Sequence, residues 1–170
     1  FTLITVPFGN YLGSDQLRCC TSSWRRVDDP MIPARLKICG IYVNSILAKT
    51  EATLAGFDEA IILNQDGHVS EGSGENIAIL RKGVLITPPL SSGCLAGVTR
   101  ELVMELADVV ERDIDPAEFG SADEAFLTSS TRDVSPISAI DEVELPAVPG
   151  PVTAGLMAAF ADLVARTTDP

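Results

Sequence analysis

Apolar residues in this chain come in short runs broken by glycine and proline. No run approaches the ~20 residues that a membrane-crossing helix needs. We therefore expect no membrane partner, and a fold assembled from short strands and amphipathic helices. With 170 residues and 46% hydrophobic content, the chain can bury one substantial core. A single domain over residues 1–170 is the simplest expectation.

The chain is strongly acidic, with a formal net charge of −12. A surface of this sign repels the phosphate backbone of nucleic acids and anionic lipid headgroups. We therefore expect neither a nucleic-acid partner nor a membrane partner.

Four cysteines occur, and none has the CxxC or Cys/His spacing of a zinc site. Cys19 and Cys20 are adjacent, while Cys39 and Cys94 stand alone. We interpret all four as inert free thiols in a reducing cytoplasm, and we expect no metal centre.

Hydrophobic periodicity and turn residues predict the elements of the fold. A loop at 7–13 is expected after the first strand, and an Asp-Gly turn at 66–67 joins two strands into a hairpin. The predicted strands are 1–6, 17–23, 59–64, 68–71, 76–80 and 84–87, with extended segments in 123–137. The predicted helices are 42–54, 98–111 and 151–166.

Lys37 is the first candidate for chemistry. It is one of three lysines, and it alone stands between apolar neighbours, Leu36 and Ile38. It also directly precedes the helix predicted at 42–54. An amine in such a place is suited to hold a carbonyl cofactor as a Schiff base.

Three polar segments each allow a structural and a functional interpretation. EGSGEN at 71–76 is either a solvated glycine-rich bend or a source of carboxylates for a ligand. The loop before Thr99 is either an ordinary helix N-cap or an anion site. SSTR at 129–132 is either a polar turn or a clasp for phosphate or carboxylate, with Arg132 as a fork donor.

The remaining basic candidates favour surface roles. Arg25 and Arg26 form a pair that we interpret as solvated rather than as an anion site. His68, the only histidine, is expected on a surface strand, and a chain with a single histidine so placed is a poor candidate for a serine or cysteine triad.

Four blocks in this order resemble the C-terminal domain of the fold-type IV pyridoxal-phosphate enzymes. The blocks are KICGIYVNSILAKTEA, EAIILNQDGHVSEGSGENIAIL, GVLITPPLSSGCLAGVTRE and DEAFLTSSTRDVSPI. The resemblance extends from about Pro7 to Val152. It implies an α+β fold with a barrel-like sheet surrounded by helices, pyridoxal 5′-phosphate as the cofactor, and a homodimer.

The resemblance also implies roles for individual residues. Lys37 matches the Schiff-base lysine and proton shuttle, and Tyr42 the tyrosine that bonds the cofactor's ring oxygen. Glu71 matches the glutamate that pairs with the pyridine nitrogen, and Leu95 a residue that packs on the ring face. The positions that hold the phosphate match Val98, Thr99 and Ser130.

Some positions depart from the family pattern. Gly40-Ile41-Tyr42 replaces glycine-asparagine-tyrosine, and Ala96 replaces a proline. Arg132 stands where the branched-chain enzymes usually carry alanine, and we expect it to pair with a substrate carboxylate. Nothing in the chain matches the family's smaller N-terminal domain, and the start at FTLITVPF without a methionine leads us to expect a missing N-terminal portion.

The resemblance implies a pyridoxal-phosphate aminotransferase. Such an enzyme moves an amino group between an amino acid, branched-chain-like or of D configuration, and a 2-oxo acid. Two alternatives stay open. One is a carbon–carbon lyase that acts on an aminodeoxychorismate-like substrate, and the other is a truncated fragment without catalysis.

Overall fold

The computed structural model describes residues 2–5 and 16–168. The strands are β1 (Leu17–Arg25), β2 (Glu59–Leu63), β3 (Val69–Gly72), β4 (Asn76–Arg81), β5 (Val84–Thr87), β6 (Val109–Glu111), β7 (Glu124–Ser129), β8 (Asp133–Ile140) and β9 (Val143–Glu144). The α helices are α1 (Tyr42–Leu54), α2 (Val98–Leu106) and α3 (Pro151–Thr168). Short 3₁₀ helices cover Ala34–Leu36, Cys39–Ile41, Leu90–Ser92 and Pro116–Ser121.

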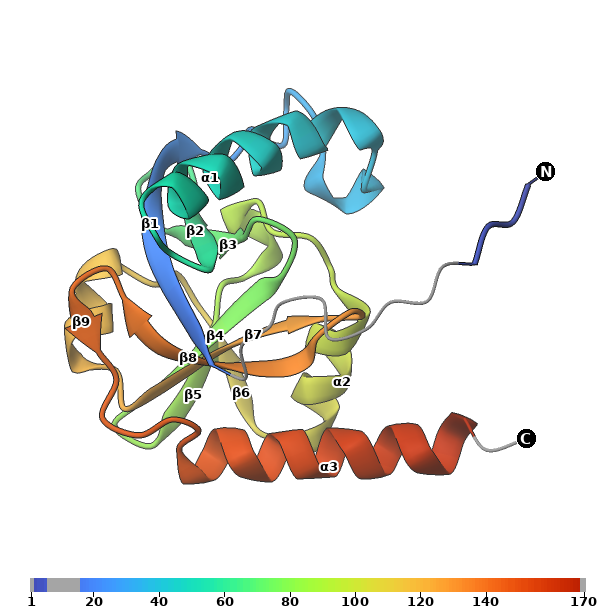
Figure 1. Cartoon of the computed structure of the whole chain (residues 1–170), viewed down its shortest axis with the longest axis vertical. Coiled ribbons are helices and arrows are strands. Elements are labelled where there is room, and N and C mark those ends of the chain that lie inside the picture. Colours follow the sequence, from blue (N-terminus) through green and yellow to red (C-terminus); the bar gives the residue numbers. More distant parts are fainter. Residues whose placement is uncertain (1, 6–15, 169–170) are drawn as a thin grey trace.

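The strands form one mixed sheet in the order β3-β2-β1-β8-β7-β4-β5-β6, and β9 pairs with β8. The pairs β1/β2, β1/β8 and β5/β6 are parallel, and the other pairs are antiparallel. The sheet curls, with α1 over one end and with α2 and α3 at the other (Figure 1). This is the α+β, barrel-like architecture that the resemblance implies.

Strand β4 separates two apolar cores, because alternate side chains of a strand point to opposite faces. Ile77 and Ile79 belong to the core inside the curled sheet. Ala78 and Leu80 belong to the core between the sheet and the helices α2 and α3. Both faces of the sheet are therefore covered, and β4 reads as a continuous apolar run rather than as an alternating one.

Helix α1 packs on the sheet through small residues. Ser45, Ala48 and Ala52 are buried, and the two alanines join Ala60 and Ile62 of β2 in a third core. Its large apolar side chains point outward, and their exposed fractions are Val43 61%, Ile46 61%, Leu47 39% and Leu54 83%. The outer surface of α1 is thus apolar.

Most predicted elements are confirmed, with two exceptions. Residues 2–5 form no strand and are exposed, and the loop predicted at 7–13 lies outside the described residues. The helix predicted over 98–111 ends at Leu106, because Ala107 has an extended backbone with φ −149° and ψ 157°. Val109 and Val110 instead pair in parallel with Leu85 and Ile86 of β5.

Candidate active site

Lys37 follows the short helix Ala34–Leu36 in a left-handed conformation, with φ 47° and ψ 40°. Non-glycine residues adopt this conformation rarely, and held positions of this kind cluster at functional sites. The backbone turn brings Lys37 Nζ to 6.0 Å from the centre of the Tyr42 ring. Leu36 and Ile38, the two apolar neighbours of Lys37 in the sequence, are both exposed.

The residues expected to hold the cofactor share one cavity. Its volume is about 280 Å³, and it lies between α1, the bend after β3 and the start of α2. Its walls include Lys37, Tyr42, Glu71, Leu95, Val98, Thr99 and Ser130. Residues from four separate stretches of the chain, 37–42, 71, 95–99 and 130, are therefore brought together by the fold.

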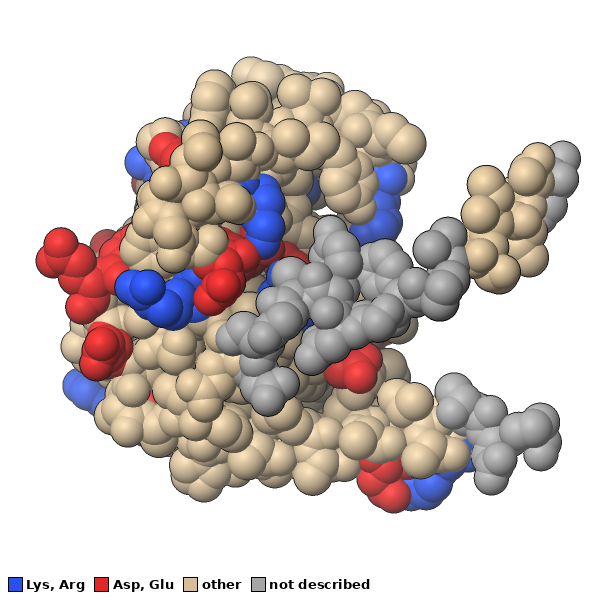
Figure 2. Space-filling view, viewed as in Figure 1, with Lys and Arg blue, Asp and Glu red and all other residues tan. Residues whose placement is uncertain are grey.

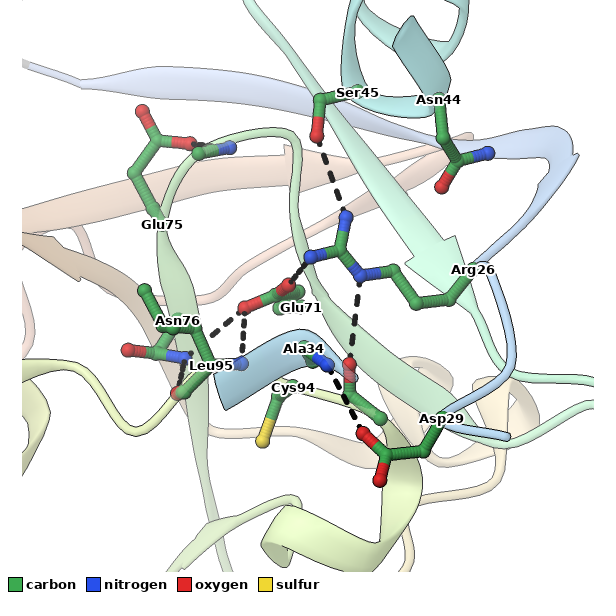
Figure 3. A network of polar contacts seen from close by, with 12 residues as sticks. Arg26, Asp29, Ala34, Asn44, Ser45, Glu71, Glu75, Asn76, Cys94 and Leu95 are labelled. Carbon is green, nitrogen blue, oxygen red and sulfur yellow. Dashed lines mark hydrogen bonds and ion pairs between the residues drawn. The ribbon is translucent and has the colours of Figure 1, made fainter. Parts of the chain in front are cut away.

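Glu71 on β3 is a buried carboxylate held from three sides (Figure 3). Its Oε1 lies 2.5 Å from Arg26 Nη2, and its Oε2 accepts hydrogen bonds from Leu95 N at 2.9 Å and Asn76 Nδ2 at 3.3 Å. Burial raises the pKa of Glu71, while Arg26 and the Leu95 N–H act in the opposite direction. The site thus contains a carboxylate in a desolvated, hydrogen-bonded setting.

Arg26, directly after β1, is the cation that compensates this carboxylate. It also donates to Ser45 Oγ at 3.3 Å and to the Gly93 carbonyl at 3.4 Å (Figure 3). The interpretation of Arg25 and Arg26 as a solvated pair is therefore wrong for Arg26, which is buried, and right for Arg25, which is exposed. A buried carboxylate is stabilised by hydrogen-bond donors or by a cation, but the sequence does not reveal that Arg26 is the cation that reaches Glu71.

The N-terminus of α2 provides amide donors at the other end of the cavity. Gly97 is the N-cap and has no side chain with which to bond the first turn. Unpaired N–H groups of a helix start favour anions. Thr99 is buried in this first turn, and Ser130 is exposed in the β7–β8 turn opposite. Amides and hydroxyls therefore converge as a phosphate would require.

Arg132 lies apart from these residues. It lines a neighbouring cavity of about 610 Å³, which shares Lys37, Tyr42 and Ser130 with the first. Its side chain is 4% exposed and forms ion pairs with Glu75 at 3.2 Å and Glu59 at 3.7 Å. The expected substrate-facing guanidinium is thus engaged by two carboxylates of the chain itself.

Charged groups of both signs gather along the middle of the molecule. Figure 2 shows acidic and basic side chains side by side between the regions of α1 and α3, whose surfaces are mostly uncharged. Within residues 2–5 and 16–168, no group of three or more acidic, histidine or cysteine residues could hold a metal ion. No helix among the described residues is long and apolar enough to cross a membrane.

A family profile described as amino-transferase class IV matches residues 1–140. The chain belongs to this family. A probable branched-chain-amino-acid aminotransferase of Aquifex aeolicus (strain VF5) is 49% identical over 141 residues, which cover 79% of this chain and 45% of that protein. Class IV members of this kind are about twice as long as the present chain, which spans about half the length of the curated relatives it matches.

Solved structures of the same family share the fold. The branched-chain aminotransferase of Thermoproteus uzoniensis, solved with norvaline, has a TM-score of 0.91 at 43% sequence identity. The matched part covers 96% of this chain and 56% of that chain. The branched-chain amino acid aminotransferase of Thermobaculum terrenum, solved in its PLP form, has a TM-score of 0.86 at 40% identity. It covers 88% of this chain and 51% of its own.

Proposed function

We propose that this chain is the cofactor-binding part of a pyridoxal-phosphate aminotransferase, which moves an amino group between an amino acid and a 2-oxo acid. The observation that carries the proposal is the shared cavity, in which an amine (Lys37), a phenol (Tyr42) and a buried carboxylate (Glu71) stand together. When bound, pyridoxal 5′-phosphate supplies an aldehyde for attachment and an electron-withdrawing ring.

The donor set fits the parts of that cofactor. Lys37 would attach the aldehyde carbon, Tyr42 would bond the ring oxygen, and Glu71 would hold the ring nitrogen in its protonated state. Leu95 would pack against the ring face. The first turn of α2, with Val98 and Thr99, would hold the phosphate together with Ser130.

The reaction asks two things of Lys37. It must be displaced by the incoming amino group, and it must then carry the proton from the substrate α-carbon. Its place at the end of a short helix, with its side chain in the cavity, leaves the amine free to move between these positions. Arg26 would compensate the charge of the buried Glu71 carboxylate through their ion pair.

We propose a branched-chain amino acid as the substrate. The support is the names of the Aquifex aeolicus relative and of the Thermoproteus uzoniensis structure, both of which are branched-chain aminotransferases. A panel of L-valine, L-leucine, D-alanine and D-leucine with 2-oxoglutarate tests this. Turnover of the D-amino acids alone would contradict a branched-chain L-amino acid as the substrate. Pyruvate release from an aminodeoxychorismate-like substrate without an amino acceptor would favour the lyase alternative.

The decisive experiment compares Lys37→Ala with Lys82→Ala. Both lysines have a left-handed backbone, with φ 47° and 52°, so both substitutions meet the same backbone conformation. Lys82 lies in the β4–β5 turn, away from the cavity. We expect Lys37→Ala to lose the visible absorbance of lysine-bound cofactor and all turnover, and Lys82→Ala to keep both. A Lys37→Ala protein that retains both would overturn the proposal.

We propose a homodimer that uses the apolar outer surface of α1. The support is the exposure of Val43, Ile46 and Leu54, which a second copy could cover. Ile46→Lys is expected to reduce the mass measured by light scattering to that of a monomer. Val84→Lys is the control, because Val84 is an exposed apolar residue on β5. An unchanged mass for Ile46→Lys would refute this surface.

We also propose that a smaller domain completes the pocket and that the protein acts in the cytoplasm. The proposal of a smaller domain rests on the share of two curated relatives that the chain matches, 45% and 49% of their lengths. The proposal of a cytoplasmic location rests on the four free cysteines of the chain. Full turnover by a protein with an intact mass of only 18.0 kDa would contradict the first. Recovery of the protein in the secreted fraction would contradict the second.

A further inference from the structure

A cluster of four charged side chains lies next to the cofactor cavity. Arg132 pairs with Glu75 at 3.2 Å and with Glu59 at 3.7 Å, and Lys49 Nζ lies 2.8 Å from Glu59 Oε2. Arg132, Glu59 and Glu75 are buried, and Lys49 is partly exposed. Two cations and two carboxylates thus face one another, and three of these four side chains are buried.

The cluster joins four segments that are distant in the sequence. Lys49 belongs to α1, Glu59 begins β2, Glu75 ends the bend between β3 and β4, and Arg132 ends the β7–β8 turn. Cys19 of β1 pairs in register with Glu59, and burial raises the pKa of its thiol, with further contributions from Glu59 and Glu75. Breaking one partner of a buried pair leaves an uncompensated charge, so each member depends on the others.

Arg132 also closes the turn that carries Ser130. Its N–H donates to the Ser129 carbonyl at 3.3 Å, and its carbonyl accepts from Ser135 Oγ at 3.1 Å. The Arg132 side chain points into the protein, whereas Ser130 is exposed and lines the cofactor cavity. The turn is therefore held from inside by the guanidinium, while Ser130 lines the cavity.

We propose that Arg132 is a positioning residue for the cofactor, which acts through Glu59 and Glu75 to fix the turn bearing Ser130, and that it does not bind substrate. The proposal rests on the function proposed above. Arg132 is a poor clamp for a substrate carboxylate, because that carboxylate would be repelled by the two it must approach. Burial, with a further contribution from the Glu59 carboxylate, raises the pKa of Glu75 to about 7.

Arg132→Ala separates the two roles when cofactor affinity and substrate KM are measured on the same purified protein. We expect the Kd for pyridoxal 5′-phosphate, from absorbance titration, to rise about tenfold or more. At saturating cofactor, KM for the amino acid should stay within about twofold. The cofactor-dependent rise in Tm should shrink in parallel. Arg132→Lys, which keeps a cation, should recover part of the affinity.

Arg81→Ala is the matched control. Arg81 is another partly buried arginine with a carboxylate partner, Glu118 at 2.9 Å, but it lines neither cavity. Its loss should leave the cofactor Kd unchanged. If Arg132→Ala fails to fold, Arg132→Lys and Glu75→Gln carry the test, since each weakens the same pair. The double variant Arg132→Lys with Glu75→Gln should then cost less affinity than the two single losses combined.

The outcomes are distinct. A KM raised tenfold with an unchanged cofactor Kd would make Arg132 a substrate clamp and overturn the inference. In that case the donor to the substrate carboxylate would be the buried Arg132 Nη1, which has no hydrogen-bond acceptor among the described residues. A lower Tm with an unchanged cofactor Kd makes the cluster structural only, which also overturns it. If the unsubstituted protein attaches no cofactor at Lys37, the proposed function itself fails.

Discussion

Arg26 and Glu71 form an ion pair of 2.5 Å in which each side chain is only 6% exposed. The pair joins the end of β1 to β3 across the intervening β2. Two further donors, Leu95 N and Asn76 Nδ2, hold the other carboxylate oxygen (Figure 3). The carboxylate that faces the cofactor cavity is therefore fixed in orientation by groups of the protein itself.

Arg26→Met tests how much the fold depends on this pair. The substitution keeps an apolar stem of similar length and leaves Glu71 buried without its cation, which typically costs about 3–5 kcal/mol. Urea unfolding measures the loss. Arg35→Met is the control, because Arg35 and its partner Asp29 are 67% and 51% exposed, and such pairs contribute about 1 kcal/mol or less. Equal losses in both variants would show that burial of the pair has no consequence.

Glu71→Gln addresses the ring-nitrogen role. The amide keeps the size of the side chain but not its charge, so cofactor attachment at Lys37 should persist while proton removal slows. Loss of a charge-assisted hydrogen bond of about 1.5–3 kcal/mol corresponds to a rate about tenfold lower or more. Single-turnover absorbance measurements check both parts. An unchanged rate would refute the role of Glu71 at the ring.

Gly97→Ala should damage the N-terminus of α2. A Cβ at Gly97 would lie 2.1 Å from Asn76 Oδ1, and Asn76 is itself bonded to the Leu95 carbonyl at 2.8 Å. Overpacking of this kind typically costs about 1–3 kcal/mol. We expect lower stability by urea unfolding together with weaker cofactor binding. Gly120→Ala, where a Cβ meets no atom within 4 Å, should change neither.

Stability should depend on pH through Glu75. Burial and the Glu59 carboxylate raise its pKa to about 7, against about 4.3 in an unfolded chain. Between these values the folded protein keeps a proton that the unfolded chain has released. Its stability therefore falls as pH rises through this window and levels off above about 7.

Glu75→Gln checks this dependence. The amide does not titrate, so urea unfolding at pH 5, 6, 7 and 8 should give a flatter profile than the unsubstituted protein. Glu105→Gln, on the exposed side of α2, should leave the profile unchanged. A profile that keeps its slope in Glu75→Gln would assign the pH dependence to other groups.

Local elements were predictable where turn chemistry and periodicity agree. The Asp-Gly turn places Gly67 at φ 88°, and the hairpin of β2 and β3 follows as predicted. Helix α1 has the predicted bounds. The helix predicted over 98–111 was too long because the apolar stripe of α2 continues into Val109 and Val110. Periodicity does not reveal that these two valines pair in parallel with β5.

Local pattern pointed to Lys37 and to three polar segments, and the resemblance assigned roles in one site to residues within them. The seven expected cofactor residues gather around one cavity, although their roles stay predictions. The charged partners were not predictable, because the pairing of Arg26 with Glu71 and of Arg132 with Glu59 depends on which strands are neighbours. Sequence spacing carries no information about sheet order across such distances.

The parallel pairing of β1 with β8 gives the molecule a high contact order. It sets Leu17 beside Ile137, and Cys19 beside Ile140. Contacts between residues so far apart form late, because a long loop must close before they contribute. Arg26, at the end of β1, reaches its place over Glu71 only when that strand has docked. Arg26 is placed by the pairing of β1 with β2, so cofactor capture would report that β1 has docked, and a chain stalled before this step would be unable to take up the cofactor.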